Sequence, residues 1–169
     1  AMGGYAFDQL CYQDVSGKWR TKTDLYGDFQ LEPTAAPIDL CDLSKAPSDW
    51  TAGGGPGDPP VVSRDAGHDG GFSLKVYVDD NVTWHGATHE IGVEVPRGYD
   101  RFVFWARGDA RTPQMSVELQ EKDSSRWIAV VDLLPEWRQY VLSSKDFVHW
   151  TDGTQRSDQV HIDNLKRIS

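Results

Sequence analysis

The chain has 169 residues, a length suited to one domain, and its 17 basic against 26 acidic residues give a net charge of −9. An acidic chain without a run of Lys and Arg repels a phosphate backbone, so we expect no nucleic-acid partner. No stretch approaches the roughly 18 consecutive apolar residues of a membrane span, so we expect none. Seven Trp, six Tyr and six Phe beside two Met favour strands and stacking surfaces over helices.

The first 40 residues have an interrupted pattern. Tyr5–Tyr12 and Lys18–Leu31 can each hold a strand, although glycine and proline break both patterns. The chain opens on Ala1 and Met2, which resemble a cloning remnant, and no signal peptide follows. We therefore expect one domain over residues 1–169, taken from a longer secreted or cell-surface protein.

Two cysteines occur, Cys11 and Cys41. Their separation matches no zinc-binding spacing. An even number of cysteines in a loop-rich chain is compatible with one disulfide, and two free thiols are the alternative. Both remain open.

Strict alternation of side-chain type dominates the chain from residue 72 onward. We predict strands at Phe72–Val78, Ile91–Val95, Arg101–Arg107, Ser116–Glu121, Trp127–Val131, Trp137–Leu142 and Val160–Leu165. Thr51–Pro60 is predicted as a loop from its glycine and proline content, and a helical turn is expected near Ser143–Phe147. Short strands separated by Gly, Pro, Asp and Ser predict an all-β, two-sheet antiparallel β-sandwich.

Alternation also predicts which side chains face outward, because successive residues of a strand point to opposite faces. If Phe102 and Phe104 enter the core, the side chain between them and those that flank them face solvent. The same argument applied to the later strands gives an outward set on one side of the sandwich: Trp105, Arg107, Glu118, Gln120, Arg138 and Tyr140. Flat aromatic rings beside planar hydrogen-bonding groups are what sugars require, because the C–H face of a sugar stacks and its hydroxyls pair.

Three further tryptophans are candidates for a ligand-binding rim. Trp84 stands in a polar stretch near a strand end, Trp127 begins an apolar strand, and Trp150 falls in a predicted loop. Each has a structural alternative, since an indole at such a position can equally pack into the protein. Trp137 is expected in the core.

The order of several motifs resembles the carbohydrate-binding modules with a galactose-binding-domain-like β-sandwich (jelly roll) fold. The motifs are Asp42–Trp50, Asp69–Val76, Tyr99–Gly108, Glu136–Leu142 and His161–Leu165. The likeness covers residues 41–169 and leaves residues 1–40 unplaced. It implies a non-catalytic module that targets an attached polysaccharide-degrading domain to its glycan.

The resemblance also implies a structural calcium ion. Carried over residue by residue, its ligands are Asp42, Asp69 and Asp163, with Asp65 as a further candidate. Calcium takes six to eight hard oxygen ligands, which carboxylates and the carbonyls of glycine turns supply. The alternative is that these acids cap turns.

Catalysis is not expected. No Gly-x-Ser-x-Gly elbow is present, and Glu118 and Glu121 point to opposite faces of a strand, a poor geometry for acid–base work. His85 and His89 would converge on a metal only on a helix, which Gly86 and the alternation disfavour. The expected function is therefore binding of a polysaccharide or oligosaccharide. The alternative is a structural or protein-interaction β-sandwich of a larger protein.

Overall fold

The computed structural model describes residues 11–13, 19–21, 36–79, 83–150 and 158–169. The chain divides into two units, Ala1–Pro37 and Ile38–Ser169. In the first unit, β1 (Cys11–Gln13) pairs antiparallel with β2 (Trp19–Thr21). These strands fall within or beside the two strands predicted for the N-terminal region, the rest of which lies outside the described residues. A single domain over residues 1–169 stays a prediction.

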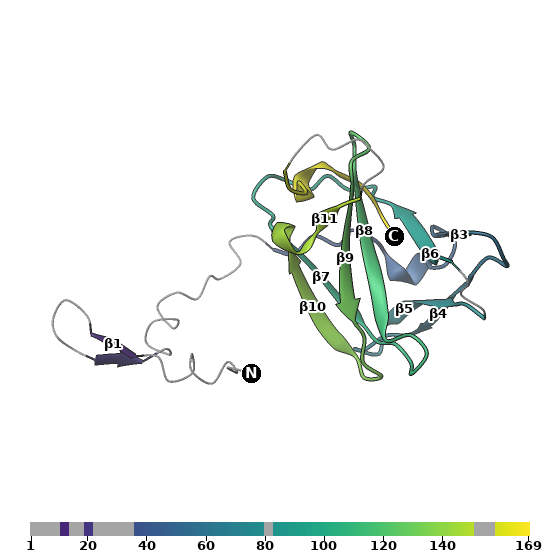
Figure 1. The fold of residues 1–169 in the computed structure, drawn as a ribbon, viewed down its shortest axis with the longest axis horizontal. Coiled ribbons are helices and arrows are strands. Elements are labelled where there is room, and N and C mark those ends of the chain that lie inside the picture. The colour runs from purple at the N-terminus through teal and green to yellow at the C-terminus, as the bar shows by residue number, and fades with distance from the viewer. Residues whose placement is uncertain (1–10, 14–18, 22–35, 80–82, 151–157) are drawn as a thin grey trace. The chain divides into compact units, whose positions relative to one another are not determined.

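The second unit is built from antiparallel strands (Figure 1). They are β3 (Thr51–Gly54), β4 (Val61–Ala66), β5 (Phe72–Tyr77), β6 (His85–Glu90), β7 (Arg101–Ala106), β8 (Gln114–Glu121), β9 (Arg126–Asp132), β10 (Arg138–Ser143), β11 (Val148–His149) and β12 (Leu165–Ile168). Six of them form one sheet in the order β11-β9-β8-β12-β6-β3, while β10 pairs with β7 and β4 with β5.

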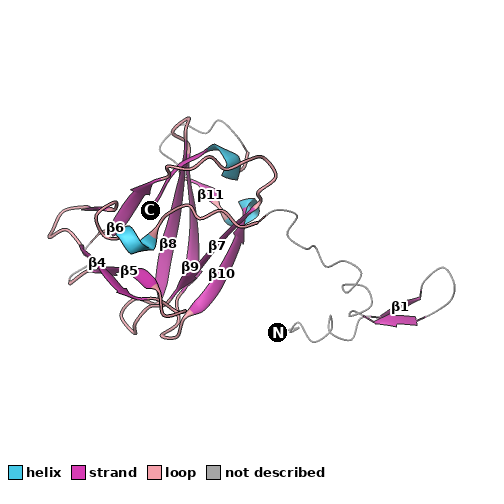
Figure 2. Cartoon of the chain, turned by 180° about the vertical axis from the view of Figure 1, so that it is seen from behind, coloured by secondary structure: helices cyan, strands magenta, loops and turns pink. Residues whose placement is uncertain are grey.

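The helical content of the described residues is limited to three short 3-10 turns, drawn in cyan in Figure 2. These are η1 (Leu43–Lys45), η2 (Ser144–Asp146) and η3 (Ile162–Asn164). The helical turn predicted near Ser143–Phe147 is confirmed by η2, which Asp146 caps by accepting hydrogen bonds from the backbone N–H and the hydroxyl of Ser143. Within the described ranges, no helix is long and apolar enough to cross a bilayer.

Most of the predicted strands are confirmed, with small shifts at their ends: those that begin near Phe72, Arg101, Ser116, Trp127 and Trp137. The prediction for Ile91–Val95 was wrong, because the strand there is β6, which ends at Glu90. The sequence of β6 has little apolar alternation, and it is held by pairing with β3 on one side and β12 on the other. Such a strand is set by its partners rather than by its local pattern.

Two other segments also differ from prediction. The predicted loop Thr51–Pro60 begins with β3, and the predicted strand Val160–Leu165 is mostly the turn η3, which β12 follows. Val160, Ile162 and Leu165 are all buried. The apolar residues are spaced as in a strand, but here an irregular segment and the turn η3 bring them into the core.

The core lies between the inner face of the six-stranded sheet and the β7–β10 pair. Leu119 and Trp127 are fully buried on the sheet side, and Phe102, Phe104 and Leu142 pack against them from the pair. The architecture is therefore all-β and sandwich-like, as predicted at that level. Burial at the sheet interface is the dominant stabilising term.

Candidate functional site

The predicted outward set does not lie on one side of the molecule. Trp105 and Arg107 belong to β7 and its C-terminal end, whereas Glu118 and Gln120 belong to β8 of the six-stranded sheet. Because the two layers pack through their inner faces, their outer faces point away from each other. The expectation of a single polar and aromatic side was wrong, and the candidates divide into two groups.

The first group is an aromatic cluster, called here the Trp105 cluster and made of His68, Trp105, Arg107 and Trp137. The imidazole of His68 stacks on the indole of Trp105, with ring centroids 4.1 Å apart and planes 11° from parallel. The His68 ring also lies edge-on to Trp137, with ring centroids 6.3 Å apart. The Arg107 guanidinium lies 4.9 Å from the centroid of the Trp137 ring. Trp105 keeps 41% of its surface exposed.

The β4–β5 turn brings His68 to this cluster. Gly67 donates its N–H to the Gly71 carbonyl oxygen at 2.9 Å, and Gly70 has a φ of 82°, which favours glycine. Asp69 Oδ1 accepts the Gly71 N–H at 2.9 Å, and this hydrogen bond lowers the pKa of the Asp69 carboxyl. The turn is thus defined by its own hydrogen bonds.

Trp105 has exposed neighbours on the same face. Gln139 is its direct partner in the ladder, and Val103 and Val141 form the next pair. Val103 is 49% and Val141 is 55% exposed. The face therefore combines an indole, a short apolar stripe and planar amide and guanidinium groups, an arrangement suited to stacking a flat ligand.

The prediction of which β10 side chains point outward was wrong by one residue. Tyr140 lies opposite Phe104 and stacks on it at 5.2 Å, so its ring belongs to the inner face. Its hydroxyl donates a 2.6 Å hydrogen bond to the carbonyl of Asp132. Arg138 shares that side of the strand, with its guanidinium 6.0 Å from the Tyr140 ring centroid, although it is exposed at the strand start. A one-residue slip exchanges the two faces.

Trp127 was also misplaced by the rim prediction. It is 2% exposed and packs edge-on against His149, with ring centroids 5.2 Å apart. It belongs to the hydrophobic core and not to an exposed rim. Trp137, which was expected in the core, is half-buried and belongs to the Trp105 cluster.

The second group lies on the outer face of the six-stranded sheet. The Arg126 guanidinium donates two hydrogen bonds of 2.7 Å to the Glu118 carboxylate and lies 5.8 Å from the ring centroid of Trp150. Gln120 is 8% exposed and accepts a hydrogen bond from Arg167 Nε. The polar groups of Glu118 and Gln120 are thus paired within the protein, and a ligand would have to compete for them.

Trp84 stands apart from both groups, immediately before β6. It is 66% exposed, and its carbonyl accepts the Gly55 N–H at 2.8 Å. Its indole is exposed to solvent, and no ring contact among the described residues joins it to Trp105 or Trp150. Trp84 therefore belongs to neither the Trp105 cluster nor the group on the six-stranded sheet.

The four candidate calcium ligands do not make one site. Asp42 pairs with Lys45 at 3.3 Å beside η1, and Asp65 pairs with Lys75 at 3.8 Å on the β4–β5 hairpin. Asp69 accepts from its own turn, and Asp163 faces Arg97 at 3.8 Å in η3. Across the part of the chain that is described, no three His, Cys, Asp or Glu residues gather as metal ligands would. A structural calcium ion stays a prediction.

Cys41 has a free thiol that is partly buried, and burial is the main cause that raises the pKa of this thiol. Cys11 lies in β1, outside the residues whose side chains are described. The disulfide between Cys11 and Cys41 therefore stays a prediction.

Glu121 carries a buried carboxyl group at the end of β8. It is 1% exposed, and its Oε1 accepts the backbone N–H of His161. Burial raises the pKa of this carboxyl, and the negative charge of Asp123 acts in the same direction, against the lowering effect of the His161 N–H. The group holds a proton in the folded state over a pH range in which the unfolded chain has lost it.

A pH dependence of stability follows from Glu121. Because the folded state binds the extra proton, the free energy of unfolding falls as pH rises from the ordinary glutamate pKa through the raised one. Glu121→Gln keeps an acceptor oxygen and stays neutral, so urea titrations at several pH values should show a smaller fall for this variant. Glu90→Gln, on an exposed side chain, is the control and should follow the wild type. Equal pH slopes in wild type and Glu121→Gln would contradict the buried, protonated carboxyl.

Comparison with known proteins adds no assignment. No protein-family model matches the chain, and neither a curated protein nor a solved structure matches it. The functional argument therefore rests on the geometry of the described residues.

Proposed function

We propose that the chain is a non-catalytic carbohydrate-binding module that holds an attached polysaccharide-degrading domain on its glycan. The observation that carries the proposal is the indole of Trp105, which is 41% exposed on the outer face of β7. Gln139 on β10 and Arg107 beyond the end of β7 supply hydrogen-bonding groups around it. Stacking gives the ligand its position, and the polar groups select among sugars.

The Trp105 cluster is organised before any ligand arrives. The stacked imidazole of His68 restricts the rotation of the Trp105 side chain, and Arg107 is held over Trp137. A side chain that is already ordered loses less conformational entropy on binding. Each sugar hydroxyl exchanges a hydrogen bond with water for one with the protein, so affinity is modest.

A module of this kind acts by anchoring. Tethering raises the effective concentration of the attached catalytic domain at the polysaccharide surface. The net charge of −9 favours neutral over strongly anionic glycans. The proposal includes secretion or cell-surface location and a jelly-roll topology of the galactose-binding-domain-like type, in keeping with the sandwich-like architecture of residues 38–169.

Affinity electrophoresis tests the proposal. The chain is run through native gels that contain plant, algal or microbial polysaccharides, with polymer-free gels as the reference. Slower migration in at least one neutral polysaccharide, reversed by the same polymer in soluble form, is expected. Unchanged migration in every polymer would overturn the proposal.

The second candidate function is a protein-interaction domain, which the exposed pair of Val103 and Val141 favours. A contiguous exposed apolar stripe on a sheet face is a feature of protein interfaces. Tryptophan fluorescence separates the two functions. An interface domain shows no spectral change with any saccharide, whereas a carbohydrate-binding face that contains Trp105 does.

A further inference from the structure

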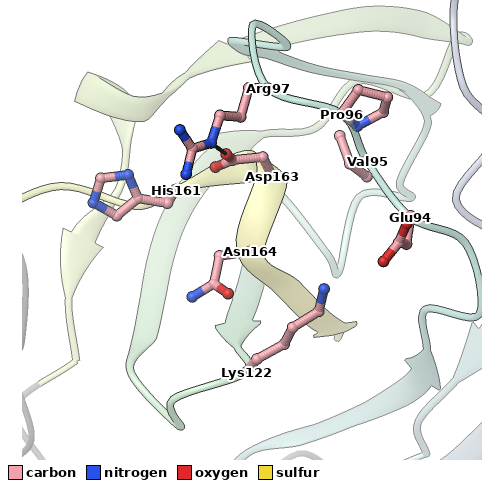
Figure 3. Close-up of a pocket in the computed structure, with 8 residues that line it drawn as sticks. All are labelled: Glu94, Val95, Pro96, Arg97, Lys122, His161, Asp163 and Asn164. Carbon is pink, nitrogen blue, oxygen red and sulfur yellow. Dashed lines mark ion pairs between the residues drawn. The ribbon is translucent and has the colours of Figure 1, made fainter.

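A polar hollow lies away from the Trp105 cluster, at the end of β8 (Figure 3). Its volume is about 590 Å³, and it is an open surface hollow, since most of its lining residues, among them Glu94 and Lys122, are exposed. Three segments line it: the loop after β6, the residue after β8, and the turn η3 with its approach. The lining residues are Glu94, Val95, Pro96, Arg97, Lys122, His161, Asp163 and Asn164.

Two charged side chains enter the hollow from different sides. Figure 3 shows the Lys122 ammonium and the Glu94 carboxylate extending toward the same space, while the Asn164 amide points to the other side of η3. Within the described residues, neither Lys122 nor Glu94 has an ion pair. The hollow thus presents a donor and an acceptor that no side chain of the described residues engages.

A loose ion pair forms another wall. Arg97 Nε lies 3.8 Å from Asp163 Oδ2, and the Arg97 side chain is 97% exposed. The two acidic and two basic side chains of the lining balance, so the hollow has no net charge when His161 is neutral. This balance contrasts with the net charge of −9 of the whole chain.

The backbone around the hollow is hydrogen-bonded. Lys122 N–H donates to the Asn164 carbonyl at 2.9 Å, and Asn164 N–H donates to the His161 carbonyl at 2.9 Å. The buried Glu121 carboxyl accepts a hydrogen bond from the backbone N–H of His161. These bonds join the end of β8 to η3, so Lys122 and Asn164 hold their relative positions without a ligand.

We infer that this hollow binds a single neutral, hydroxyl-rich ring, one sugar unit of a saccharide. Glu94 accepts hydrogen bonds from hydroxyls, Lys122 donates to hydroxyl oxygens, and Val95 with Pro96 gives an apolar wall for the C–H face of the ring. An anion would meet Glu94 and Asp163, and a cation would meet Lys122 and Arg97. This inference rests on the proposed carbohydrate-binding function and adds a second site to it.

The test is a titration of the full chain with the methyl glycosides of glucose, galactose, mannose and xylose. Backbone amide signals in NMR spectra are recorded at each step of the titration. Saturable shifts of the amides of Glu94, Lys122 and Asn164 are expected for at least one glycoside, with dissociation constants on the order of millimolar. Glu94→Gln and Lys122→Met should each weaken this binding by roughly tenfold, since each removes a charge-assisted hydrogen bond. Lys145→Met, in η2 and outside the lining, is the matched control and should bind as the wild type.

Glucuronate and glucosamine complete the titration. Tighter binding of either one than of every neutral glycoside would overturn the inference, as would the absence of saturable shifts or an equal loss in Lys145→Met. Trp105→Ala distinguishes this site from the proposed function. Loss of polysaccharide retention in Trp105→Ala with glycoside binding intact shows two sites, and glycoside binding that disappears in Trp105→Ala would contradict a separate hollow.

Discussion

Trp105→Ala should weaken binding of the retained polysaccharide by about 30-fold. Stacking of a sugar on the exposed indole buries roughly 80 Å² of apolar surface, and at about 25 cal/mol per Å² this corresponds to about 2 kcal/mol. The ring is 41% exposed, so its removal leaves the core intact. Affinity electrophoresis over a range of polysaccharide concentrations gives the dissociation constants of both proteins.

Trp150→Ala is the matched control for this substitution. Its indole is 47% exposed, close to the value for Trp105, but it adjoins Arg126 on the six-stranded sheet. Retention of Trp150→Ala should equal that of the wild type. If Trp150→Ala lost retention and Trp105→Ala did not, the polysaccharide would bind the outer side of the six-stranded sheet instead of the Trp105 cluster.

Trp127→Ala should reduce the free energy of unfolding by about 3–5 kcal/mol. The side chain is 2% exposed and lies in the cluster that includes Leu119 and Phe147, so its truncation removes apolar burial and leaves a cavity. Urea unfolding followed by far-UV circular dichroism measures the change without depending on the tryptophan signal.

The comparison for Trp127 is Trp84→Ala, at an indole that is 66% exposed. That variant should lie within about 0.5 kcal/mol of the wild type, as surface substitutions usually do. A Trp127→Ala protein as stable as Trp84→Ala, with weaker polysaccharide binding, would restore Trp127 to the ligand rim.

Local alternation predicts some strands well. In β7 the pattern of exposed and half-buried residues follows the prediction at every position from Arg101 to Ala106. The pattern is clear there because aromatic residues occupy the inner face of a strand whose outer face is solvated. The exposed Trp105 was therefore predictable from its two neighbours.

The facing of β10 could not be derived in the same way. Its residues alternate weakly, since Tyr140 and Gln139 can each serve on either face. Pairing with β7 decides the matter by setting Tyr140 opposite Phe104. Register between distant strands depends on tertiary packing, which local sequence does not contain.

The role of His68 was missed for a similar reason. Its only local signal is the glycine-rich turn that follows it, Asp69–Gly71, and that turn predicts a bend without a partner. The contact with Trp105 joins the β4–β5 hairpin to the β7–β10 strand pair, and only the fold places them together. Likewise, the paired state of Glu118 depends on Arg126 of the neighbouring strand.

The indole N–H signal of Trp105 in NMR spectra of the wild-type chain gives the most direct test of the account. During titration with an oligosaccharide prepared from a retained polysaccharide, this signal should shift and saturate. The Trp150 indole should not move. A Trp105 signal that stays unchanged while the chain binds the oligosaccharide would contradict the central claim.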